Sequence, residues 1–71
     1  MNISDSQKEL LKEYGLVLPD NIDEIDEIEK INEVLLDLDD KITEIGFDSN
    51  YDLNEAGLKL QRLYDQLYNQ N

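Results

Sequence analysis

Six apolar residues near the middle of the chain recur at alternating intervals of three and four: Ile28, Ile31, Leu35, Leu38, Ile42 and Ile45. This alternation gathers side chains into one stripe along an α-helix, whereas a half-buried strand would need an interval of two. Val34 widens the stripe. The spacing therefore predicts a long amphipathic helix, and because its apolar stripe must be covered, it also predicts helical neighbours.

The segment IDEIDEIEKI, residues 22–31, has isoleucines at intervals of three, with five acids and one lysine between them. Early acids suit the positive end of a helix dipole, so we expect the long helix to begin near residue 22. An interval of three falls behind the α-helix by about 60° at each step, so Ile22 cannot share a face with Ile31. Ile22 and Ile25 are expected to pack on the first helix or on the connector before them.

A first helix is predicted over about residues 5–14. Ser4 with Gln7 has the pattern of a capping box, and Gly15 is suited to end the helix in a left-handed conformation. The residues that follow, 16–19, read LVLP and favour extended backbone, because a proline restricts the residue before it. No second strand candidate exists to pair with this segment, so it is predicted to be a buried connector.

A third helix is predicted over about residues 53–68. Asp52 with Glu55 gives a second capping pattern, and Gly57 inside the helix would allow another helix to approach closely. The helix has its own stripe at intervals of three and four: Leu53, Ala56, Leu60, Leu63 and Leu67.

These elements predict an all-α fold: a small three-helix bundle, in which the long central helix, residues 22–45, forms an antiparallel hairpin with the C-terminal helix. Seventy-one residues are enough for one domain only, so residues 1–71 are expected to form a single acidic helical domain. Three apolar residues fall outside the predicted core: Leu36, Leu58 and Tyr68.

The charge of the chain is concentrated in its middle. The sequence has 18 acidic and 6 basic residues, and residues 20–55 hold fourteen of the acids with two lysines. That segment accounts for the whole net charge of −12, while both ends are near neutral. Direct binding to nucleic acid is not expected, because phosphate contacts need a basic surface. Binding to anionic membranes is opposed by the same repulsion.

Acids of the long helix fall opposite the apolar stripe, and neighbours three or four residues apart lie about 5–6 Å from one another. We predict that they form a docking surface for a basic protein, which would gain fast, salt-sensitive association from such a field. Tyr51 and Tyr68 are candidate anchors, because tyrosine is enriched at interface hot spots. The alternative is a solvated face that only aids solubility. The acids expected to steer the partner are Asp26, Glu33, Asp37, Asp40 and Glu44.

Catalytic, metal and cofactor sites are not expected. The chain has no cysteine and no histidine, which removes thiol nucleophiles, the usual neutral-pH base and the commonest metal ligand. Residues 48–54 place oxygen ligands at alternate positions, as an EF-hand calcium loop does. The sixth position of that loop should be Gly and is Leu53, and the twelfth should be Glu and is Lys59. We therefore predict that the protein is not an enzyme and binds no calcium.

No stretch resembles a signal peptide or approaches the length of a membrane span, so a cytoplasmic protein is expected. The favoured function is a binding module that inhibits or masks a basic partner. That partner could be a nuclease toxin, as for an immunity protein or antitoxin, or a DNA-binding protein, as for a phage anti-defence factor or DNA mimic. The alternative is a self-associating structural or accessory helical protein, such as a homodimer.

Overall fold

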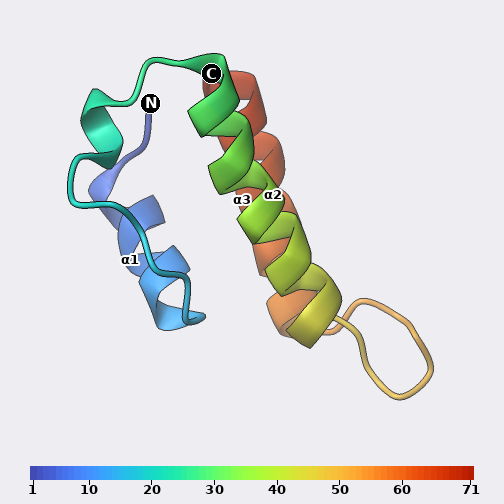
Figure 1. The fold of residues 1–71 in the computed structure, drawn as a ribbon. Coiled ribbons are helices and arrows are strands. Elements are labelled where there is room, and N and C mark those ends of the chain that lie inside the picture. Colours follow the sequence, from blue (N-terminus) through green and yellow to red (C-terminus); the bar gives the residue numbers. More distant parts are fainter.

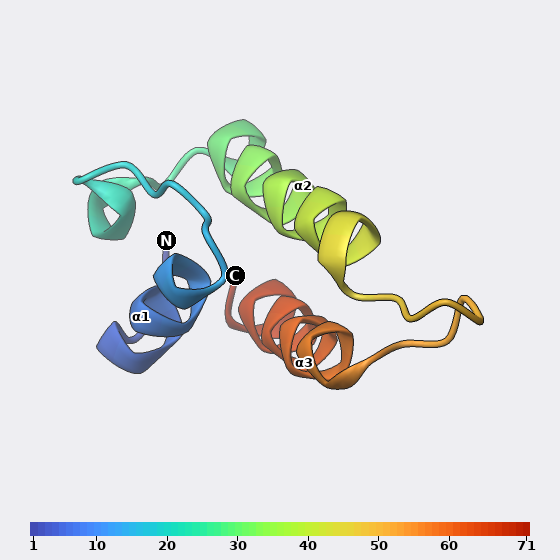
Figure 2. The ribbon, with the colours of Figure 1, turned by 90° about the horizontal axis from the view of Figure 1, so that it is seen from below.

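The computed structural model describes residues 1–71 and is all-α, as predicted. It contains three α-helices and one short 3-10 helix, in the order α1 (Asp5–Glu13), η1 (Ile22–Glu24), α2 (Ile28–Ile45) and α3 (Glu55–Gln70). α2 and α3 lie side by side as an antiparallel pair, and α1 lies along one side of that pair (Figures 1 and 2). None of the helices is both long and apolar enough to cross a membrane.

The two ends of α1 form as the sequence predicts. The Ser4 hydroxyl accepts a hydrogen bond from the backbone N–H of Gln7 at 3.2 Å, and the Gln7 side chain accepts one from the backbone N–H of Ser4 at 2.9 Å. This reciprocal capping box satisfies two N–H groups that a helix start leaves free. At the other end, Gly15 has a φ of 88°, a conformation that glycine adopts without steric cost.

The prediction that the long helix begins at residue 22 is wrong. Ile22–Glu24 forms the 3-10 helix, Ile25 is extended, and α2 begins only at Ile28. A 3-10 helix has three residues per turn, which matches the interval between the first two isoleucines. In a continuous α-helix Ile22 would point about 160° away from Leu38. The break lets Ile22 turn into the core, where it is only 3% exposed.

Residues 16–27, called the strap below, lead from α1 to α2 (Figure 1). The prediction that residues 16–19 form a buried connector is wrong at Val17 and Pro19, which are both exposed. Leu16 is buried and Leu18 is half-buried, but Val17 between them is 93% exposed. Successive side chains of extended backbone point to opposite sides, so Val17 cannot face the core when both of its neighbours do.

Polar contacts made by Met1 and Lys8 hold the strap against the N-terminal part of the chain. The backbone nitrogen of Met1 donates a hydrogen bond to the carbonyl oxygen of Ile25. The ammonium group of Lys8 donates to the carboxylate of Asp23 and lies 3.7 Å from the carboxylate of Asp5. The hydrogen bond to Asp23 is the main reason that the pKa of Lys8 is raised above its ordinary value of 10.5.

The hairpin of α2 and α3 closes through a contact between two glycines. A Cβ atom on Gly57 would lie 2.1 Å from the carbonyl oxygen of Gly46, so the start of α3 touches the backbone at the end of α2. The close approach predicted at Gly57 is therefore confirmed. Beside this contact, the Asn54 side chain accepts a hydrogen bond from Gly57 N and donates one to the carbonyl of Ile45, both at 2.8 Å.

Asn54, rather than the predicted pair of Asp52 and Glu55, is thus the N-cap of α3. The helix runs over Glu55–Gln70 instead of residues 53–68. An Asn cap serves here because its amide both accepts from the new helix and donates to the previous one, whereas an aspartate can only accept.

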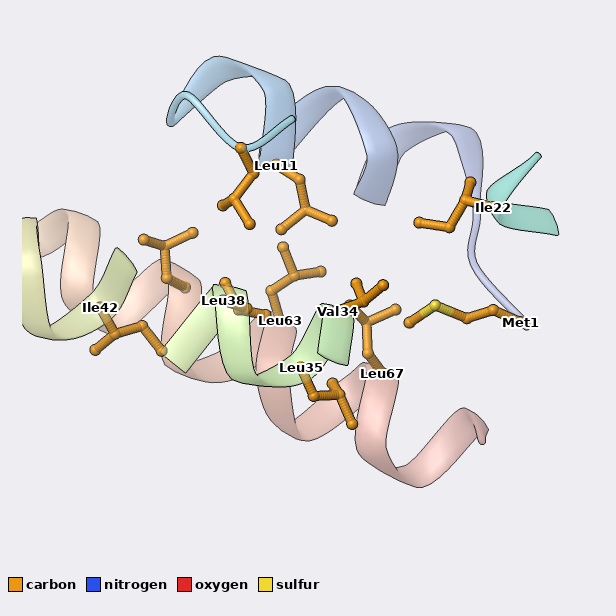
Figure 3. Close-up of a cluster of buried hydrophobic side chains, with 11 residues drawn as sticks. Met1, Leu11, Ile22, Val34, Leu35, Leu38, Ile42, Leu63 and Leu67 are labelled. Carbon is orange, nitrogen blue, oxygen red and sulfur yellow. The ribbon is translucent and has the colours of Figure 1, made fainter. Parts of the chain in front are cut away.

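The core lies between the three helices and contains no buried polar side chain (Figure 3). Its members come from the predicted stripes of α2 and α3, with one residue of α1 and three from the segments around it. Half-buried Ile31 and Ile45 pack against this cluster, but the predicted stripe fails at Ile28, which is 72% exposed in the first turn of α2. The core residues are Met1, Leu11, Leu16, Ile22, Val34, Leu35, Leu38, Ile42, Leu60, Leu63 and Leu67.

Polar contact between α1 and α3 is made by uncharged amides, called the amide ladder below. The side chain of Gln7 donates to those of Gln66 at 3.2 Å and Gln70 at 2.9 Å. The backbone of Asn2 donates to the Asn71 side chain at 2.7 Å, and the Gln70 side chain donates to the Asn2 carbonyl at 3.0 Å. The near-neutral ends of the chain are therefore joined to each other. The ladder comprises Asn2, Gln7, Gln66, Gln70 and Asn71.

Candidate protein-binding surface

Four of the predicted site residues lie together on α2 and are called the carboxylate row below. They are three or four residues apart on the helix face turned away from the core, and every one of them is exposed. Their regular spacing follows from the same helical periodicity that buries Leu38 on the opposite face. The members of the row are Glu33, Asp37, Asp40 and Glu44.

The row has almost no compensation by cations. Glu44 lies 3.5 Å from the ammonium group of Lys41, while Glu33, Asp37 and Asp40 have no ion pair. Like charges at this spacing each weaken a helix by about 0.2–0.5 kcal/mol. All ion pairs in the molecule are those of Lys8 with Asp5 and Asp23, Lys41 with Glu44, and Lys59 with Glu55.

Asp26 does not belong to the row. It was predicted to continue the carboxylate face of the long helix, but it lies in the strap, two residues before α2 begins at Ile28. Its side chain is exposed and borders a shallow depression with Glu24 and Lys30. Asp26 thus adds negative charge near the N-terminal end of α2 without taking part in the helical spacing.

The two candidate anchors lie at opposite ends of the hairpin. Tyr51 is in the loop between α2 and α3, has a φ of 64° and is 87% exposed. Tyr68 is near the end of α3, is 64% exposed and stacks on Tyr64 with a centroid distance of 6.4 Å. Tyr68 borders a hollow with Ile28 and Leu35. The two tyrosines are therefore far apart, and they do not form one site with the row.

A groove that the sequence did not indicate lies directly beside the carboxylate row. It has a volume of about 250 Å³ and runs between the strap and the first three turns of α2. Two members of the row, Glu33 and Asp37, form part of its lining. The sequence signal that could have found it is Val17, the apolar residue of the strap that extended backbone directs away from the core.

In the loop between α2 and α3, the side chain of Asp48 is held by hydrogen bonds within the turn. One carboxylate oxygen of Asp48 accepts from the backbone N–H of Asn50 at 2.8 Å and from that of Asp52 at 3.1 Å. Phe47 and Leu53 pair through one isolated antiparallel bridge. No group of three or more acidic side chains in the molecule is arranged so that it could hold a metal ion.

Comparisons of the chain with protein-family models, with curated proteins and with solved structures each gave no match. The surface itself is therefore the basis for assigning a function.

Proposed function

We propose that this protein is a cytoplasmic, non-catalytic binding module whose carboxylate row docks onto a strongly basic protein and masks it. The partner would be a nuclease, as for an immunity protein or antitoxin, or a DNA-binding protein, as for a phage anti-defence factor. The observation that carries the proposal is the row itself, with four exposed acids on one helix face and a single ion pair among them, between Glu44 and Lys41.

The way in which the fold separates charged from uncharged polar groups supports this proposal. The contact between α1 and α3 is made by the amide ladder, so the acidic residues of α2 are not required there. The acidic residues of α2 do not contribute to the core either, because no polar side chain is buried. Repulsion along the row therefore weakens the fold without serving an internal contact. A basic partner relieves that repulsion on binding and gains a fast encounter from the field.

A second candidate is self-association, which the exposed apolar residues favour. Leu36 is 62% exposed, and Leu58 and Tyr68 are also exposed on α3. In this case two copies would cover those residues and the acids would act only on solubility. Sedimentation equilibrium over a dilution series separates the candidates, because only self-association makes the apparent mass depend on concentration.

The proposal is tested by removing the charge of the row without changing the shape of its side chains. In the row variant, Glu33→Gln, Asp37→Asn, Asp40→Asn and Glu44→Gln are combined. The control variant carries Glu9→Gln, Glu13→Gln, Asp20→Asn and Asp65→Asn, which removes the same number of exposed acids elsewhere, none of them in an ion pair. Both variants therefore have the same net charge.

Wild type, row variant and control variant are each used as bait in extracts of the native host at low salt, followed by elution with rising salt. We expect a basic nuclease or DNA-binding protein to be retained by wild type and control and lost from the row variant. The association rate of the purified partner should fall about tenfold or more in the row variant only. Equal capture by all three baits, or recovery of nothing except the bait, would contradict the proposal.

A further inference from the structure

The groove beside the carboxylate row combines an apolar lining with acidic edges. The strap contributes Val17, Leu18 and Ile25, and α2 contributes Val34 at the base. Val34 is buried and Val17 is almost fully exposed, so the apolar surface runs from the core to the solvent. At about 250 Å³ the groove is smaller than the 300–1,000 Å³ typical of small-molecule sites. Its size suits one large side chain.

The acidic edge of the groove belongs to the carboxylate row. Glu33 and Asp37 line it, both exposed and without an ion pair. Lys30 also lines the groove and is the one basic side chain there. The net charge of the lining is therefore negative, which favours a partner segment with more than one cation and opposes an acidic one.

The strap wall of the groove is fixed before any partner arrives. Ile25 accepts a hydrogen bond from the backbone nitrogen of Met1, and Asp23 accepts one from Lys8. Next to Asp23, the side chain of Ile22 is buried in the core. A wall held at these points need not be ordered on binding, which lowers the cost of association.

We infer that the groove receives one large apolar side chain from a basic segment of the partner, while lysines or arginines on either side of it contact Glu33 and Asp37. This inference rests on the proposed function and specifies the kind of segment that the row recognises. A second copy of this chain is a poor occupant, because it carries the same net charge of −12. The carboxylates attract the segment, and the apolar side chain sets its register on α2.

Two short peptides serve as probes in the test. One consists of lysines and arginines with a single central leucine, and the other has asparagine in place of the leucine. Affinities of both for the full chain are measured by fluorescence anisotropy at low salt. We expect wild type to bind the leucine peptide about tenfold more tightly, a difference of about 1.4 kcal/mol. Methyl signals of Val17, Leu18, Ile25 and Val34 should shift with the leucine peptide only.

Val17→Ser is the variant that addresses the groove, since a residue so exposed can be changed without disturbing the core. It should remove most of the preference for leucine and leave the affinity for the asparagine peptide unchanged. Leu58→Ser is the matched control, because Leu58 is an exposed apolar residue on α3 outside the groove. It should leave both affinities unchanged.

The outcomes separate this inference from the proposed function. If both peptides bind wild type equally and the row variant weakens both, the inference is overturned and the proposed function stands. If neither peptide binds, both are overturned. Leucine-dependent shifts at Ile28 and Tyr68 would assign the apolar contact to the hollow on α2 and α3 and overturn the inference. So would shifts at Val17 that appear on concentrating the protein alone, because a second copy would then fill the groove.

Discussion

The α2–α3 hairpin and the α1 side of the molecule are joined to the common core by different means. In the hairpin, backbone meets backbone at Gly46 and Gly57, and the Asn54 side chain bonds both helices. On the other side, α1 is joined to α3 through the long side chains of the amide ladder and to the strap through Lys8 and Asp23. Both regions contribute buried leucines, so the difference lies in what surrounds the core.

This difference predicts unequal local stability. A contact between backbones has no flexible atoms that could absorb a change, whereas exposed side-chain hydrogen bonds contribute little and exchange readily with water. Regions with few such fixed contacts open at lower free energy than the rest of a domain. We therefore expect α1 and the strap to open before the hairpin does, and the groove wall to belong to the less stable region.

The largest effect is expected from truncating one buried leucine in each region. Leu11 of α1 and Leu38 of α2 are both fully buried. Leucine-to-alanine changes at such sites cost about 2–5 kcal/mol, against a total of about 4–10 kcal/mol for a domain of this length. Leu38→Ala should destabilise the whole domain and speed amide hydrogen exchange in all three helices. Leu11→Ala should speed amide hydrogen exchange in α1 and the strap while α2 and α3 stay protected.

Hydrogen exchange followed residue by residue is the measurement that decides between these outcomes. Equal acceleration of exchange in all three helices of the Leu11→Ala variant would mean that the molecule opens as one unit. The two regions would then not differ in their free energy of opening, although both variants would still be destabilised.

A smaller effect is expected from Gly57→Ala. Alanine gains about 1 kcal/mol of helix propensity over glycine. Its Cβ would, however, lie 2.1 Å from the Gly46 carbonyl oxygen, and overpacking costs about 1–3 kcal/mol. We expect a net loss of up to about 2 kcal/mol in urea unfolding. Asn69→Ala, at an exposed position of the same helix, is the control and should be neutral or slightly stabilising. If both variants behave alike, the hairpin contact is looser than described.

The smallest effect concerns the pair of Lys8 and Asp23, and the stability that this pair contributes changes with pH only in the alkaline range. Because the pair raises the pKa of Lys8 above 10.5, its stabilisation is present below that pH and is lost as pH rises through the raised value. The stability difference between wild type and Asp23→Asn should therefore be constant near neutral pH and shrink above pH 10.5. Taking the difference cancels the contributions of all ionisable groups that the two proteins share. A difference that does not change with pH would remove Lys8 as its cause.

The parts of the fold that were predictable are those set by local periodicity. Intervals of three and four gave the buried faces around Leu38 and Leu63, and the hydroxyl and amide of Ser4 and Gln7 gave the start of α1. The row was predictable for the same reason, because Glu33 and Asp37 take their positions from the helix that buries Leu38. These features depend on neighbours within a few residues along the chain.

The parts that were missed depend on contacts between distant residues. Acids after residue 22 favour a helix start there. Burial of Ile22 in the core outweighs this preference, and the α-helix begins only at Ile28. Ile28 continues the stripe in sequence, yet at the end of the hairpin it stays 72% exposed and borders a hollow with Tyr68 of α3. The groove was missed because its strap wall is placed by Met1 and Lys8, which lie far from it in sequence.

The separation of the carboxylate row from the amide ladder affects how the protein is oriented when it approaches a charged partner. α2 and the strap lie on one flank of the molecule, and the contact of α1 with α3 lies on the other (Figure 2), so the negative charge is distributed unevenly across it. The protein is 39 Å long and about 20 Å thick. In the field of a cationic surface it experiences a torque that turns α2 toward that surface. Within the screening length of about 8 Å in physiological salt, its orientation is selected before any atoms touch.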